Sequence, residues 1–141
     1  MSQDHVLVAY PGAAFPGFAF DPAWSNVPPG ILNPEEKPGG FLVIYVVATL
    51  TIKPETRAEF IAAATACIKE TRREPGNIAY DLHESVTDPA KMVFVEQWEN
   101  AEALVPHRGM EHMKTFGRVA VKCFTAPPKI EVITPEKVET R

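Results

Sequence analysis

The sequence has few cysteines and no long runs of one charge, and each shortage removes a class of protein. Cys67 and Cys123 are its two cysteines, they lack CxxC spacing, and both lie among apolar residues. We therefore expect two buried, reduced thiols rather than a disulfide or a zinc site. The net charge is -4 and no five like charges occur in a row. Neither a nucleic-acid footprint nor a polybasic membrane patch is expected.

Long apolar runs are also missing. The longest, Phe41 to Leu50, is far shorter than the roughly 20 residues that a membrane-spanning helix needs. Lys37 is the only lysine or arginine before Lys53, so the N-terminus lacks the basic region of a signal peptide. We expect a cytoplasmic protein with no membrane partner. Its 141 residues suffice for one ordinary core with an appendage.

Residues 1–40 differ in composition from the rest of the chain. They hold seven of the 14 prolines and five of the eight glycines, so no helix or sheet is expected to run through them. The same region is too apolar for a solvated linker, because it carries Phe15, Phe18, Phe20, Trp24, Ile31 and Leu32. We interpret it as an N-terminal arm that packs onto a partner subunit, with a floppy tail as the alternative.

The middle of the chain alternates between strand and helix patterns. β-branched and aromatic residues predict a buried strand over 41–53. Apolar residues at helical spacing predict a helix over 56–74, opened by a capping box of Thr56 and Glu59. Glu74-Pro75-Gly76 should end that helix.

The second half repeats the alternation. Strands are predicted at 77–85 and 91–98, joined by turn residues. Asn100 should cap a short helix from 101 to about 105, and a second amphipathic segment follows it and ends near Cys123. A last strand is predicted at 129–134, before a frayed tail over 135–141.

The predicted order is strand, helix, strand, strand, helix, strand. This βαββαβ order is typical of the α+β ferredoxin-like split βαβ fold, a four-stranded antiparallel sheet with both helices on one face. Val43, Val93 and Val95 make the other face of the sheet apolar. We therefore expect a homodimer, in which a partner sheet covers that face.

Residues that could carry chemistry concentrate between Val95 and Phe116. This segment contains His107 and His112, two of the four histidines of the chain. Histidine is the side chain whose unperturbed pKa lies near neutral pH, so either could serve as a base or a proton relay. His83 is a third candidate, for which a surface or dimer-contact role is the alternative.

Several pieces together resemble one family. They are Glu74-Pro75-Gly76, Tyr80, Val95-Glu96-Gln97-Trp98-Glu99, and the spacing to His107 and His112-Met113-Lys114. In this order they make residues 41–134 similar to the antibiotic biosynthesis monooxygenase family, and to its quinol monooxygenase branch in particular. The resemblance implies a dimeric α/β barrel, a pocket between sheet and helices, and oxidation of a hydroxylated aromatic by dioxygen. It implies no flavin, haem or metal.

The resemblance also implies roles for single residues. Trp98 matches a Trp that lines the substrate pocket in the anthrone-oxidising members, and Glu96 matches their acidic residue two places earlier. His107 matches the histidine after the short helix, and His112 matches the second histidine of the quinol type. Catalytic roles are thereby implied for Trp98, His107 and His112. Core packing alone for Trp98 and a solvated cap for His107 are the alternatives.

Departures from the family pattern narrow the chemistry. Phe94 stands where the anthrone oxidisers have an Asn that helps to bind substrate, and Leu104 stands where they have a Tyr. Both argue against a tricyclic anthrone. The haem-degrading members carry an Asn on the first strand, and 41–53 contains none; their Trp and His positions correspond to His107 and Gly117. Haem degradation is therefore not expected.

The expected substrate-binding residues surround Trp98 on its strand face and along the second amphipathic segment: Met92, Phe94, Glu96, Phe116 and Arg118. The apolar members would supply flat walls. Glu96 shares this apolar face, where an unpaired charge is costly. We therefore expect Glu96 to bind a histidine, an arginine such as Arg118, or a substrate hydroxyl.

These observations predict a cofactor-independent monooxygenase that oxidises a quinol or another hydroxylated aromatic with dioxygen. Dioxygen is a triplet and reacts slowly with closed-shell molecules until the substrate becomes electron-rich by losing a proton. The protein then needs a dry pocket, a base tuned near neutral pH and donors for the oxyanion. A non-catalytic dimeric α/β barrel, a stress-response protein that holds a small hydrophobic ligand, is the alternative. A lyase or isomerase on the same scaffold is a third possibility.

Overall fold

The computed structural model describes residues 43–141, so the arm interpreted in residues 1–40 lies outside the described residues. The elements, in chain order, are β1 (Ile44–Thr51), the 3-10 turn η2 (Pro54–Thr56), α1 (Arg57–Thr71), β2 (Asn77–Glu84), β3 (Lys91–Trp98), α2 (Ala101–His107), α3 (Glu111–Cys123) and β4 (Lys129–Ile133). No helix in the described part is long and apolar enough to cross a lipid bilayer.

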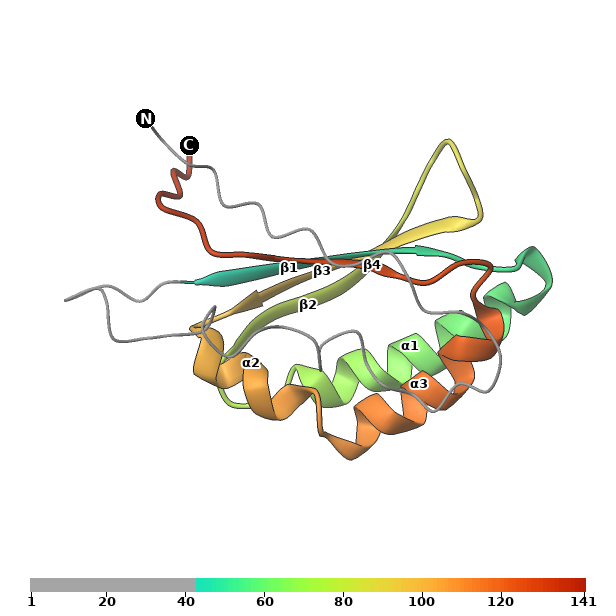
Figure 1. Cartoon of the computed structure of the whole chain (residues 1–141), viewed down its shortest axis with the longest axis horizontal. Helices are drawn as coiled ribbons and strands as arrows, with labels where there is room; N and C mark the ends of the chain where they lie inside the picture. Colours follow the sequence, from blue (N-terminus) through green and yellow to red (C-terminus); the bar gives the residue numbers. More distant parts are fainter. Residues whose placement is uncertain (1–42) are drawn as a thin grey trace.

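The four strands form one sheet in the order β2-β3-β1-β4, and every neighbouring pair is antiparallel. All three α-helices lie on one side of this sheet, as Figure 1 shows. The predicted α+β ferredoxin-like fold is therefore confirmed. Its physical basis is the alternation along each strand, which sends every second side chain toward the helices.

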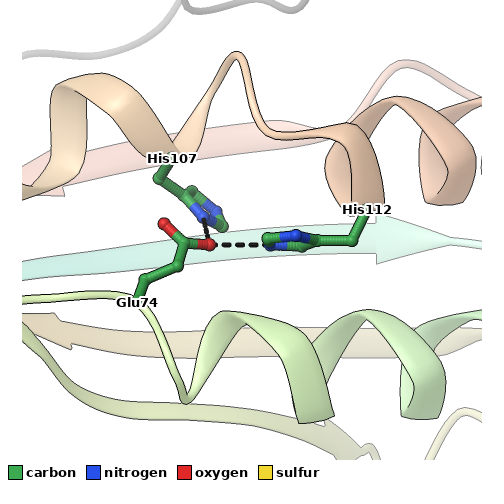
Figure 2. A group of neighbouring side chains, drawn as sticks. All are labelled: Glu74, His107 and His112. Atoms are coloured by element: carbon green, nitrogen blue, oxygen red, sulfur yellow. Dashed lines mark hydrogen bonds and ion pairs between the residues drawn. The ribbon is translucent and has the colours of Figure 1, made fainter.

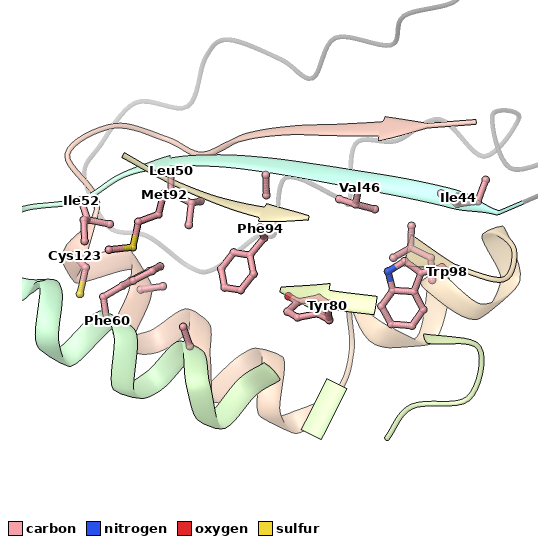
Figure 3. Packing of buried hydrophobic residues seen from close by; sticks show 14 residues of the cluster. Ile44, Val46, Leu50, Ile52, Phe60, Tyr80, Met92, Phe94, Trp98 and Cys123 are labelled. Carbon is pink, nitrogen blue, oxygen red and sulfur yellow. The ribbon is translucent and has the colours of Figure 1, made fainter. Parts of the chain in front are cut away.

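The core lies between the sheet and the helices. In β1 the alternate residues Ile44, Val46, Ala48 and Leu50 are buried, and those between them are half-buried. Figure 3 shows this cluster extending along the sheet, from Trp98 and Ile44 at one end to Met92, Phe60 and Cys123 at the other. Trp98 pairs with Ile44 and Met92 with Leu50, so the register of β1 and β3 fixes the two ends of the core.

The opposite face of the sheet is apolar as well. Tyr45, Val47, Val93 and Val95 point away from the helices and are half-buried, and Ile133 next to Tyr45 is 44% exposed. Val47 pairs directly with Val95 in the register of β1 and β3. This surface, which we call the outer apolar face, consists of those five residues. It is the face that the sequence predicts as a dimer contact.

The start of α1 differs from the prediction. Thr56 does not cap the helix with its side chain, because its Oγ1 donates instead to the carbonyl of Lys53 at 2.9 Å. Pro54 begins a 3-10 turn that takes up Thr56, so α1 begins at Arg57 and ends at Thr71, inside the predicted 56–74. The predicted capping box is therefore wrong.

Two local predictions are confirmed. The backbone N–H of Ala103 donates to Oδ1 of Asn100 at 2.8 Å, which is the predicted N-cap of α2. The helix then continues through Pro106 to His107, two residues beyond the predicted end. Cys67 and Cys123 are both free and buried, and burial raises the pKa of the Cys67 thiol to about 11. That thiol is therefore not a nucleophile at neutral pH.

Candidate functional site

A glycine allows the turn after α1 to pack closely against α2. Gly76 has a φ of +80°, and a Cβ built on it would lie 2.4 Å from the Cβ of Ala103 in α2. Only glycine accepts both conditions without strain. The turn is also tied to the end of β3, because the N–H of Glu99 donates to the carbonyl of Gly76 at 2.9 Å. This close approach holds Glu74, two residues earlier, against the end of α2.

Two histidines meet across the break between α2 and α3. In one continuous helix, residues five apart would point about 140° away from each other. Here α2 ends at His107, and the N–H groups of Gly109 and Met110 bond back to the carbonyls of Pro106 and His107. The chain then restarts as α3 at Glu111. The two rings, His107 and His112, consequently lie with their centroids 6.2 Å apart.

Glu74 joins the two histidines. Its Oε1 lies 2.8 Å from Nδ1 of His107 and 2.7 Å from Nε2 of His112, as the dashed lines of Figure 2 show. The side chains of Glu74 and His107 are 6% and 0% exposed, and that of His112 is 19% exposed. We call these three residues the Glu-His-His cluster. It brings together the turn after α1, the end of α2 and the start of α3.

The surroundings of His107 determine its protonation state and its tautomer. Burial lowers its pKa from the ordinary value, and the hydrogen bond to Glu74 opposes that shift without reversing it. The ring is therefore neutral at pH 7, and its Nδ1–H donates to the Glu74 carboxylate. Its other nitrogen, Nε2, is buried and makes no hydrogen bond. A neutral imidazole in this tautomer presents a lone pair at Nε2.

Trp98 and Glu96 form a hydrogen-bonded pair beside the Glu-His-His cluster. The indole Nε1–H of Trp98 donates to Oε2 of Glu96 at 2.9 Å, and both residues are buried. The indole of Trp98, rather than a histidine or Arg118, is therefore the partner of Glu96. The expected contact with a substrate hydroxyl stays a prediction. Burial raises the pKa of Glu96 to about 7, with the indole hydrogen bond opposing the shift and the nearby Glu74 charge adding to it.

Aromatic rings enclose His107. The ring centroid of Trp98 lies 4.8 Å from that of His107, and the ring of Tyr80 meets His107 edge-on at 5.4 Å. Phe94 packs against Tyr80 at 5.3 Å and against Phe116 at 5.8 Å. These contacts make a continuous row of flat apolar side chains that ends at His107.

The structure brings some of the expected site residues together and separates others. Trp98, His107 and His112 converge, and Glu96 adjoins Trp98. Met92 is buried at the other end of the core in Figure 3, roughly 20 Å along β3 from Trp98 by strand geometry. Arg118 is 69% exposed and faces Glu111 at 3.8 Å.

Glu74 belongs to the site, although the sequence indicates it only as part of a helix stop and of the family resemblance, with no role in chemistry. Its two histidine partners lie 33 and 38 positions further along the chain, beyond the reach of any local pattern. A signal was present in the Glu74-Pro75-Gly76 triplet. The Pro-Gly turn marks the point at which the chain leaves the helix, so Glu74 does not belong to the solvated face of α1.

Comparison with known proteins identifies related chains. The family model described as "Antibiotic biosynthesis monooxygenase" matches residues 43–119, which contain every residue of the site. A Bacillus subtilis protein named "Putative monooxygenase YcnE" is 31% identical over 97 residues, covering 69% of this chain and 100% of that protein. "Putative monooxygenase Rv0793" of Mycobacterium tuberculosis is 32% identical over 92 residues, covering 65% of this chain and 90% of that protein.

Solved structures agree with the fold. The structure of Rv0793 superposes with a TM-score of 0.65 at 28% identity, covering 70% of this chain and 99% of that one. A conserved protein from Methanosarcina mazei Go1 gives a TM-score of 0.66 at 27% identity and covers 68% of this chain and 95% of that one. Each match covers about two-thirds of the chain.

Proposed function

Because this chain belongs to the antibiotic biosynthesis monooxygenase family, we propose that it oxidises a quinol or another hydroxylated aromatic with dioxygen, without a cofactor. One observation carries this proposal: a buried, neutral His107, oriented by Glu74 and in tilted ring contact with Trp98, with its Nε2 lone pair unpartnered. A base of this kind suits the removal of a phenolic proton in a dry site.

The aromatic row supports the choice of substrate class. Trp98 and Tyr80 pack against His107, and Phe94 packs against Tyr80, so a planar ring admitted beside His107 would meet flat apolar side chains. The phenolic hydroxyl of that ring would donate to Nε2 of His107. Because this hydrogen bond forms first, the phenolic proton can transfer directly to Nε2. The resulting phenolate is electron-rich enough to reduce dioxygen.

The reaction balances with the substrate as sole reductant. A benzenediol and one dioxygen give one hydroxyquinone and one water. A new bond forms between a ring carbon and oxygen, the O–O bond breaks, and the second oxygen leaves as water with two hydrogens that the substrate has lost. The protein needs only to accept protons and return them, and histidine side chains such as His107 and His112 can do this.

We also propose a homodimer formed through the outer apolar face. None of the described helices covers this face of the sheet, and a second copy of the same sheet is the simplest symmetric cover for an apolar face. Tyr45, Val47 and Val95 support this face as the contact. The partners of the chain would then be its own copy, a small aromatic substrate and dioxygen.

The test is oxygen uptake by metal-free full-length protein with a panel of benzenediols. We expect His107→Gln to lower kcat/KM at least about 100-fold, the usual minimum for losing a general base. Trp98→Ala should also lower kcat/KM, because it removes the ring that packs against His107. His83→Ala, which changes an exposed histidine of β2, should leave kcat/KM unchanged. Uptake that persists when His107→Gln and Trp98→Ala are combined in one protein would remove this site from the reaction. Binding of aromatics without uptake would favour the ligand-holding alternative.

A further inference from the structure

The Glu-His-His cluster has the composition of a metal site as well as that of a proton relay. It offers two imidazole nitrogens and one carboxylate oxygen, and these three atoms all lie within 4.8 Å of one another. The carboxylate oxygen lies 2.8 Å and 2.7 Å from the two nitrogens. Three donors from three separate elements are thus directed at one small region of space, as Figure 2 shows.

The two nitrogen-to-oxygen separations suit ligands of one ion. Bonds from a transition-metal ion to imidazole nitrogen or carboxylate oxygen are about 2.0–2.2 Å long. Two ligand atoms at right angles around such an ion therefore lie roughly 3 Å apart by the same bond lengths. The two nitrogen-to-oxygen distances approach that value. A small movement of the His112 side chain, the most exposed of the three, would bring its nitrogen-to-oxygen distance to that value.

The donor set selects the class of ion. Two histidines with one carboxylate are typical of catalytic zinc sites and of mononuclear non-haem iron(II) sites, which keep further positions open for water or substrate. Magnesium and calcium prefer all-oxygen ligands and should not bind here. The expected ion is a divalent transition metal.

The charge of the site also favours a cation. Glu74 is almost fully buried, and its second oxygen, Oε2, makes no hydrogen bond. A bound divalent ion would compensate buried negative charge and could take Oε2 as a further ligand, which removes an unsatisfied polar atom.

The protein holds the ligands in place in advance. Ring contacts with Trp98 and Tyr80 fix the plane of His107, and the turn at Gly76 fixes Glu74. His112 lies at the start of α3 and retains some contact with solvent, so it provides the entry path. The ligand side chains therefore lose little conformational freedom when an ion binds, and preorganisation of this kind raises the affinity for the ion.

We propose that Glu74, His107 and His112 bind one divalent transition-metal ion, for which Zn²⁺ is the probe. This site also regulates the reaction proposed above, and that second part rests on the proposed function. When Nδ1 of His107 binds the ion, the single ring proton must sit on Nε2. The lone pair that would accept the substrate proton is then gone, so metal binding and turnover exclude each other.

Calorimetric titration of chelator-treated, tag-free full-length protein with Zn²⁺ tests the site. We expect one ion per chain in the unchanged protein and in the control His83→Ala, which removes an exposed histidine. His112→Ala and Glu74→Gln should each weaken binding at least about 100-fold, beyond the 10–100-fold typical of residues that only support a ligand. Mg²⁺ should give no binding heat. Circular dichroism checks that each variant is folded.

The outcomes separate the two proposals. Zn²⁺ affinity that is equal in His112→Ala, Glu74→Gln and the unchanged protein overturns the metal site, whatever the activity. Loss of binding in His83→Ala alone overturns it as well, because the ion then sits on the surface. If Zn²⁺ binds as expected and no benzenediol is oxidised in either state, the site stands and the proposed function fails. Oxidation that requires the metal would overturn both the inhibition and the cofactor-free reaction.

Discussion

Glu96 should make the stability of this protein fall as the pH rises from 5 to 8. Glu96 is 2% exposed, its carboxyl group accepts a hydrogen bond from the Trp98 indole, and burial raises its pKa from 4.5 to about 7. A group whose pKa is higher in the folded than in the unfolded state favours folding when protonated. That contribution is complete below pH 4.5 and is lost as the pH passes 7.

The size of the effect follows from the shift. Each pKa unit corresponds to about 1.4 kcal/mol, so the full span from 4.5 to about 7 is about 3 kcal/mol. Most of it, about 2–3 kcal/mol, falls between pH 5 and pH 8 by the same linkage relation. Glu96→Gln keeps an oxygen that can accept from the indole and cannot ionise. This variant should lack that part of the pH dependence.

Urea unfolding followed by circular dichroism, at one fixed protein concentration, measures the difference. We expect the free energy of unfolding of the unchanged protein to fall more steeply with pH than that of Glu96→Gln, and the two lines to separate by about 2–3 kcal/mol between pH 5 and 8. Titrating groups that do not interact with Glu96 are common to both proteins and cancel in this comparison. Parallel lines across that range would show that Glu96 is not held protonated by burial.

The turn that positions Glu74 and the outer apolar face give two further tests. Gly76→Ala should lower the free energy of unfolding by about 2–4 kcal/mol, from its positive φ and its overlap with Ala103. In thermal and urea unfolding, adding Ala103→Gly should cost less than the sum of the two single changes; strict additivity would refute the overlap. Val95→Lys should convert the proposed dimer to a monomer in sedimentation velocity, whereas Val86→Lys on the fully exposed hairpin tip should not. An unchanged sedimentation coefficient in Val95→Lys would reject that interface.

Local patterns were sufficient for the strands. The period of two in β3, with Met92, Phe94, Glu96 and Trp98 on one face, predicts the residues 91–98 that the structure assigns. Pairing is then constrained, because a slip of one residue would turn that whole face toward the other side of the sheet. The helix start at Thr56 was mispredicted because two local signals compete there, and the proline turn prevailed over the capping residue.

What the sequence determined by itself is the framework: the order of elements, the buried thiols, the Asn100 cap, and the short segment in which the histidines lie. The tertiary structure alone decided that Glu74 meets His107 and His112, and that the indole of Trp98 satisfies Glu96. The reason is the distance along the chain over which each effect acts. Periodicity and turn chemistry act over a few residues, whereas a buried carboxylate takes its partners from whichever elements the core packs against it.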